Sequence, residues 1–161
     1  MAKGKSRSII PIRITGIRRS GKSVILEQIM QEVSEKSDNI IYDGDVALNS
    51  IRCPDNRYDL TQNLENIVYN ELLYMGYEVY VYNNAGKEID FLASKGGKTY
   101  FVQVAYSVME EKAYAREFAA FKGIDNLSRK IIITNDEIDY STSTVDHIKL
   151  KDFLLMESLD K

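Results

Sequence analysis

Residues 60–107 decide the fold of this chain: LTQNLENIVYNELLYMGYEVYVYNNAGKEIDFLASKGGKTYFVQVAYS. Apolar side chains recur at helical spacing over residues 60–75 and form one stripe: Leu64, Ile67, Val68, Leu72 and Met75. Gly76 follows them, in the place where a glycine commonly ends a helix. The next residues are rich in β-branched and aromatic types and predict three strands, at 77–82, 87–93 and 99–107. The links between them contain Asn and Gly and are too short for a crossover, so these strands are predicted to be antiparallel.

The elements after residue 107 complete an α/β (α+β) fold. A helix is predicted at 110–122, followed by Gly123, and a fourth strand at 130–134. A helical crossover between two strands favours a parallel pair, so the fourth strand is predicted to run parallel to a neighbour. A short strand at 145–148 and a helix at 151–156 follow. The prediction is a mixed sheet flanked by helices.

The N-terminal part has a different pattern, which predicts strand, loop, helix and strand. The strands are expected at 8–15 and 39–42, with a helix at 22–35. Between the first strand and the helix lies GIRRSGKS (16–23), which matches the Walker A pattern at every fixed position. In this motif backbone N–H groups surround the phosphates, Lys22 reaches the β- and γ-phosphates, and the Ser23 hydroxyl binds Mg²⁺. The predicted nucleotide-binding residues are therefore Gly16, Gly21, Lys22 and Ser23.

Hydrolysis of a nucleotide needs more than this loop. An acidic side chain on a neighbouring strand must hold the Mg²⁺, and another group must orient water. Asp43 and Asp45 are the only local candidates for that acid, because a turn-rich break begins after the 39–42 strand. We therefore expect three segments: a P-loop fragment at 1–45, a linker at 46–58, and a second domain at 59–161. Two interpretations stay open for the loop: residual binding of ATP and Mg²⁺, or a fragment that binds no nucleotide.

The amino-acid composition bears on disulfides, metal sites, nucleic-acid contact and membrane insertion. Cys53 and His147 are the only cysteine and histidine, so an intrachain disulfide and a zinc site of Cys and His ligands are not expected. The first 22 residues carry seven basic side chains and no acid, while the remainder has 14 basic and 24 acidic residues, or −10. The basic segment is compatible with contact to a phosphate backbone and equally with a solvated terminus. No apolar run is long enough for a membrane span, and we expect a cytoplasmic protein.

Two stretches resemble one known family. ITGIRRSGKSVILEQI (14–29) resembles the P-loop region of a widespread family of prokaryotic AAA-type ATPases. Residues 64–107 resemble the C-terminal domain that those ATPases carry, a domain of unknown function that looks like the restriction-endonuclease, or PD-(D/E)XK, fold. The central ATPase region, with its Walker B strand, sensor residues and winged helix, has no counterpart in this sequence.

The nuclease-like resemblance implies particular site residues. The acid on the first helix corresponds to Glu65, with Glu71 as second choice, and the strand aspartate corresponds to Asp90. Glu65 and Asp90 would hold Mg²⁺, as Ser23 would in the P-loop. Where the pattern has Glu-x-Lys on the third strand, this chain has QVA (103–105), so Gln103 replaces a carboxylate and no lysine follows. Lys87, Lys98 and Lys112 are conceivable substitutes for that lysine. Strand alternation predicts Glu88, Asp90 and Leu92 on one face of their strand.

These observations favour a nuclease-like domain whose site is catalytically degenerate and which serves binding or interaction. Two alternatives remain: a P-loop enzyme (ATPase or phosphotransferase), and an active Mg²⁺-dependent DNA nuclease. A strand–helix–strand fragment cannot bury its own apolar face, so the N-terminal part is expected to pack on the second domain or to form a homo-oligomer. Nucleic acid stays an untested partner.

Overall fold

A computed structural model describes residues 5–8, 60–84, 87–125 and 127–160. The chain divides into two units, and all the described residues belong to the one formed by residues 1–9 and 44–161. The other unit, residues 10–43, lies outside the described residues. The predicted helix at 22–35, the predicted strand at 39–42 and the whole Walker A loop are therefore outside them as well, including Gly16, Gly21, Lys22 and Ser23.

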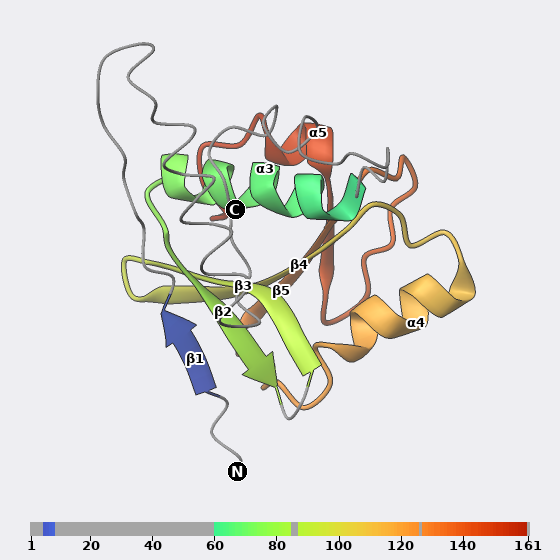
Figure 1. The fold of residues 1–161 in the computed structure, drawn as a ribbon, viewed down its shortest axis with the longest axis horizontal. Coiled ribbons are helices and arrows are strands. Elements are labelled where there is room, and N and C mark those ends of the chain that lie inside the picture. The colour runs from blue at the N-terminus through green and yellow to red at the C-terminus, as the bar shows by residue number, and fades with distance from the viewer. Residues whose placement is uncertain (1–4, 9–59, 85–86, 126, 161) are drawn as a thin grey trace, which may run out of the picture. The chain divides into compact units, whose positions relative to one another are not determined.

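The described residues form one mixed sheet with helices packed against it (Figure 1). In chain order the elements are β1 (Lys5–Ser8), α3 (Leu60–Tyr74), β2 (Glu78–Asn84), β3 (Lys87–Lys95), β4 (Lys98–Ala105), α4 (Glu111–Ala119), β5 (Arg129–Thr134), β6 (Asp146–Lys149) and α5 (Leu150–Phe153). The six strands lie side by side in the order β1-β2-β3-β4-β5-β6. Pairing is antiparallel from β1 to β4 and parallel from β4 to β6. The predicted α/β class, the antiparallel meander and the parallel fourth strand are confirmed.

Helix α3 ends where the sequence indicates. Gly76 has φ 84°, the left-handed region that glycine adopts without steric cost. Its N–H donates to the carbonyl of Leu73 at 3.0 Å, and the N–H of Tyr77 donates to the carbonyl of Leu72 at 3.0 Å. These two bonds form a Schellman motif, which satisfies carbonyl groups at the helix end and turns the chain into β2.

The two longer helices cover opposite faces of the sheet. Helix α3 packs against β2, β3 and β4, and its Tyr69 ring lies 6.0 Å from that of Phe91 on β3. Phe91 pairs with Val102 on β4, so by alternation Phe101 points to the other face. There Phe101 belongs to a buried cluster with Phe121, which follows α4. Helix α5 packs on β5 and β6 and lies with α3 above the sheet in the view of Figure 1.

A β-bulge interrupts strand β3. Tyr80 pairs with Leu92 and Tyr82 with Ile89, so Val81 faces two residues, Asp90 and Phe91. Beyond the bulge the alternation is reset, and Ile89 and Leu92 pack against the same cluster. The simple period-two prediction, which put Leu92 and Ile89 on opposite faces, is therefore wrong. The extra residue in the strand is the reason, because it changes which side chains share a face.

Strand β1 forms in the basic N-terminal segment, where the sequence did not predict it. Lys5–Ser8 pairs antiparallel with β2, from Lys5 opposite Asn83 to Ser8 opposite Tyr80. The strand expected at 8–15 lies outside the described residues except for Ser8. In the part of the chain that the structure describes, no helix has the length and apolar character that crossing a membrane requires.

Candidate functional site

The candidate site is built around Asp90, which lies in the bulge of β3. Its Oδ2 accepts a hydrogen bond from the backbone N–H of Val104 on β4, at 2.7 Å. The regular pairing of β3 with β4 extends only to Phe91 opposite Val102, so the side chain of Asp90 takes the N–H of Val104 just beyond the paired residues. Bulges commonly re-aim a side chain next to a functional site. Here the bulge aims the carboxyl of Asp90 at the neighbouring strand.

The surroundings of Asp90 favour its neutral form. Burial raises the pKa of this carboxyl well above its usual value, and the negative charge of Glu65 on α3 raises it further. The N–H of Val104 acts in the opposite direction, and the charges of Glu117 and Glu88 again raise the pKa. The structure thus brings Glu65 within electrostatic range of Asp90.

Gln103, the third predicted site residue, is bound to a side chain that the sequence analysis did not select. Its Nε2 donates to Oε2 of Glu117 at 3.0 Å, and both side chains are buried. Its own Oε1 is buried and has no hydrogen-bond partner among the residues that the structure describes. Arg116 completes the group, since its Nε lies 2.8 Å and its Nη2 lies 2.7 Å from Oε1 of Glu117. An amide on β4 and a carboxylate on α4 therefore meet where the family pattern has a strand carboxylate.

A local signal for Glu117 is present in the sequence. Glu117 lies three residues after Tyr114 and next to Phe118, both of which pack on the core cluster. A charged residue at that spacing shares the apolar face of its helix. Burial of a charge needs a partner, and the partners are Gln103 and Arg116. The identity of these partners depends on the packing of α4 on β4, which the sequence does not reveal.

The position of the lysine in the PD-(D/E)XK pattern holds an apolar residue in this chain. Ala105, at its position, is only 4% exposed and contributes no charge. Lys98 binds Oδ1 of Asp160 at 2.8 Å. Lys112 is exposed on α4, and the side chain of Lys87 lies outside the described residues. Arg116 does contribute a positive charge to this cluster, through its ion pair with Glu117.

Metal binding at the site stays a prediction. Among the residues that the structure describes, no three His, Cys, Asp or Glu side chains are grouped so that they could hold a metal ion. The raised pKa of Asp90 means that a proton would compete with a metal for this carboxyl at low pH. Ser23, the predicted Mg²⁺ ligand of the P-loop, lies outside the described residues.

An open polar groove of about 760 Å³ lies at the start of β4 and β5, away from Asp90. Four of its charged groups form two ion pairs, and Asp125 accepts the backbone N–H groups of Leu127 and Ser128. Arg129 binds Oδ2 of Asp146 at 2.5 Å, and Lys98 binds Asp160. The hydroxyl of Tyr100 also donates to Asp160, and burial together with this carboxylate raises the pKa of Tyr100 to about 12. These contacts hold the C-terminal residues against the sheet.

Comparison with known proteins identifies the domain. Residues 61–153 match the model of a domain of unknown function, DUF4143. The chain is also similar to an uncharacterized protein of Haemophilus influenzae, with 39% identity over 87 residues. That alignment covers 54% of this chain but 20% of the relative, so this chain spans about a fifth of the relative's length. No solved structure matches the chain. Because the family model covers more than half of the sequence, the chain is a member of the DUF4143 family.

Proposed function

We propose that residues 60–160 are a nuclease-like binding or interaction domain without catalytic activity, carried by a cytoplasmic AAA-type ATPase. This proposal rests on the contact between Gln103 and Glu117. In this contact the amide of Gln103 stands where the PD-(D/E)XK pattern has a strand carboxylate. We propose in addition that Gly16, Gly21, Lys22 and Ser23 retain binding of phosphate or of ATP with Mg²⁺.

The placement of the site residues supports the nuclease-like part. Glu65 lies on the first helix of the domain, α3, Asp90 on the second strand of its meander, β3, and Gln103 on the third, β4. These are the elements that carry the corresponding residues in the restriction-endonuclease-like fold named above. The sequence of helix, three antiparallel strands, crossover helix and parallel strand is compatible with that fold.

The chemistry supports the non-catalytic part. Cleavage of a phosphodiester by this type of site needs a metal that activates water and a positive group that stabilises the developing charge. Gln103 offers a neutral oxygen instead of a charged ligand, and Ala105 offers no cation. Loss of a single preorganised electrostatic group costs about 10²–10³ in rate. Two such losses in one site favour binding over cleavage.

A plasmid-cleavage assay tests this proposal. The full chain is incubated with supercoiled plasmid and Mg²⁺ or Mn²⁺, next to Asp90→Ala and Gln103→Glu. We expect the wild type to cleave no faster than Asp90→Ala. Metal-dependent cleavage that disappears in Asp90→Ala would contradict the proposal and establish the nuclease alternative. Gln103→Glu restores the carboxylate of the family pattern, and activity in this variant alone would identify Gln103 as the reason for inactivity.

A nucleotide titration tests the P-loop part separately. We expect Mg·ATP to bind the wild type and to lose affinity in Lys22→Ala, because Lys22 contacts the β- and γ-phosphates in this motif. The matched control is Lys36→Ala, a lysine outside the motif. Equal signals for wild type and Lys22→Ala would remove nucleotide binding from the proposal. Turnover of bound ATP would instead favour a P-loop enzyme.

A further inference from the structure

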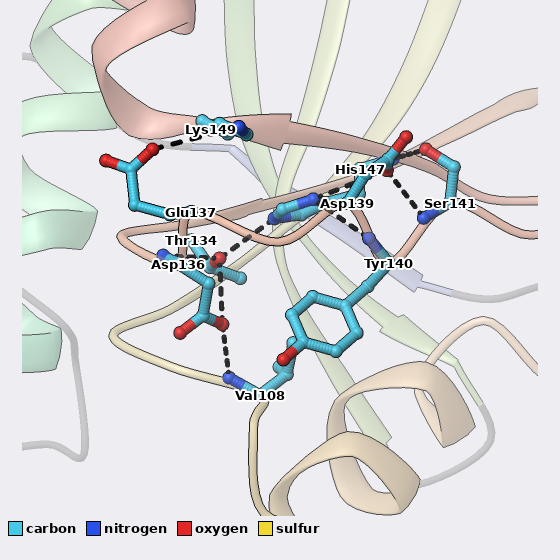
Figure 2. A network of polar contacts seen from close by, with 9 residues as sticks. All are labelled: Val108, Thr134, Asp136, Glu137, Asp139, Tyr140, Ser141, His147 and Lys149. Atoms are coloured by element: carbon cyan, nitrogen blue, oxygen red, sulfur yellow. Dashed lines mark hydrogen bonds and ion pairs between the residues drawn. The ribbon is translucent and has the colours of Figure 1, made fainter.

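The single histidine of the chain lies at the centre of a buried network between β5 and β6 (Figure 2). His147 is on β6 beside Ile132 of β5, and its side chain is 1% exposed. One ring nitrogen, Nε2, lies 2.9 Å from Oγ1 of Thr134, and the other, Nδ1, accepts the backbone N–H of Tyr140 at 3.2 Å. The ring therefore connects the end of β5 with the loop that leads to β6, here called the β5–β6 loop (residues 135–145).

The contacts of Thr134 define the protonation state of the His147 ring. Thr134 donates its hydroxyl proton to Oδ2 of Asp136 at 3.1 Å and accepts the backbone N–H of Asp136 at 3.1 Å. The carboxylate of Asp136 also accepts the N–H of Val108 at 2.8 Å and the hydroxyl of Ser107 at 2.7 Å. Because Thr134 has given its only proton to Asp136, its oxygen must accept from Nε2 of His147. The network thus requires a neutral ring with its proton on Nε2 and a lone pair on Nδ1.

A carboxylate that could accept a hydrogen bond from a protonated Nδ1 lies beside this nitrogen. The carboxylate Oδ1 of Asp139 lies 3.6 Å from this nitrogen, beyond hydrogen-bond distance, and accepts the N–H of Ser141 at 2.8 Å. A protonated ring donates from both nitrogens. Its Nδ1–H could no longer accept from Tyr140, and it would reach Asp139 after a movement of about 1 Å. Neutral and protonated His147 therefore favour different positions of the same loop.

We propose that His147 is a pH-dependent switch of the β5–β6 loop. Above the transition its neutral ring holds the backbone N–H of Tyr140. When a solvent proton adds to the lone pair of Nδ1, Tyr140 loses its acceptor and the new Nδ1–H binds the carboxylate of Asp139. The loop residues Asp139 to Ser141 then leave the position that they have in Figure 2.

The charges around the ring set the direction of the pH dependence. Burial lowers the pKa of His147 below its ordinary 6.5, while Asp139 and Asp136 oppose this shift and Lys149 on β6 supports it. Lys149 and Lys151 of α5 are both paired with Glu137, at 3.8 and 2.6 Å. A lowered pKa means that the neutral form stabilises the fold. This stability is present above pH 6.5 and is lost as the pH falls through the pKa of the folded protein.

Release of Tyr140 would also affect helix α4. Its ring lies edge-on to His147 at 5.6 Å and 6.3 Å from the ring of Tyr114 on α4. Tyr114 is stacked on Phe118 at 4.1 Å, within the cluster that α4 forms with the sheet. A change in the loop therefore alters packing on the helix that also carries Glu117.

Nitrogen-15 NMR of the full-length chain tests the switch directly, because only one histidine contributes signals. At pH 8 we expect the Nε2–H tautomer. On acidification the imidazolium should form below pH 6.5, and the amide of Tyr140 should lose protection against hydrogen exchange about tenfold, corrected for the intrinsic rate, with the same midpoint. An Nδ1–H tautomer at pH 8, or a Tyr140 amide that does not respond when the ring protonates, would overturn the proposal.

Two variants distinguish the switch from general acid unfolding. His147→Asn keeps an acceptor near the position of Nδ1 that does not titrate, and the protection of Tyr140 should then be independent of pH. Asp139→Asn removes the negative charge that accepts the new Nδ1–H hydrogen bond, and the ring should protonate at lower pH than in the wild type. Unchanged protonation of His147 in Asp139→Asn would show that Asp139 does not accept this hydrogen bond and would contradict the proposed switch.

Discussion

The contacts of the Asp90 carboxyl are set by the backbone conformation of β3. An aspartate within a strand has poor β propensity, and here it lies at the point where Val81 faces two residues of β3. The bulge lets its carboxyl take the N–H of Val104, which the regular ladder leaves beyond its last pair. The same position places it near Glu65 and Glu117, whose charges make ionisation unfavourable.

Asp90→Asn is expected to raise stability at neutral and alkaline pH. The amide oxygen can still accept the N–H of Val104, and the variant avoids the cost of a buried negative charge near other carboxylates. Because the pKa of Asp90 is raised, its neutral form stabilises the fold below about pH 3.8, and this stability is lost as the pH rises through the pKa of the folded protein. The gain from Asn should therefore shrink on acidification, which urea unfolding at pH 8, 6 and 4 can measure.

Glu88→Gln is the control for this prediction. Glu88 also influences Asp90, but its side chain is exposed, so its replacement should change the free energy of unfolding by no more than about 0.5 kcal/mol. A loss of stability at pH 8 in Asp90→Asn would mean that the ionised carboxylate is favoured in the folded state.

At the level of elements, local chemistry explains most of the agreement between sequence and structure. Helix α3 was expected at 60–75 and spans Leu60–Tyr74, because both its apolar stripe and the stop at Gly76 are properties of neighbouring residues. The hairpin links fixed the antiparallel order of β2, β3 and β4 for the same reason.

The features that sequence reasoning missed depend on partners distant in the chain. The bulge at Asp90 is visible only once β2 is paired with β3, and β1 exists only through its pairing with β2. Of the site, Glu65, Asp90 and Gln103 could be named from the resemblance, but Glu117 required knowledge of how α4 packs. The contacts of His147 could not be predicted either, because the loop residues that bind it lie outside its own strand.

The turn between α3 and β2 allows a test of backbone conformation alone. At Gly76 an added Cβ would meet only the end of the Lys95 side chain, at 3.8 Å, so space is available. The positive φ is not favourable for alanine, and Gly76→Ala should lose about 1–2 kcal/mol of stability in urea unfolding. Gly76→Asn should lose less, since asparagine adopts this region more readily. Equal losses in the two variants would point to a steric cause.

At the scale of the whole molecule, the sheet continues from a parallel half into an antiparallel half, and β1 covers the β2 edge. The backbone groups of an uncovered edge strand can pair with another chain. The arrangement of β1 therefore determines whether this edge is available for a second copy or another partner.

Deletion of residues 1–8 is expected to produce concentration-dependent self-association. It removes β1 and leaves β2 unpaired on one side. Size-exclusion chromatography with light scattering at several concentrations can compare this variant with the full chain. Deletion of residues 1–4 is the matched control, because it retains Lys5–Ser8. Identical masses for both deletions would show that β1 does not protect the edge.

The attachment of β1 to the sheet rests on the continuity of the backbone through residues 9–59. A four-residue strand gains about 0.5–1.5 kcal/mol from each backbone hydrogen bond, whereas a free peptide gives up about 4–15 kcal/mol of translational and rotational freedom on binding. The intervening chain supplies a high local concentration that a separate peptide lacks. A separate peptide with the sequence of Lys5–Ser8 would therefore not stay on the β2 edge, although it could form the same backbone hydrogen bonds.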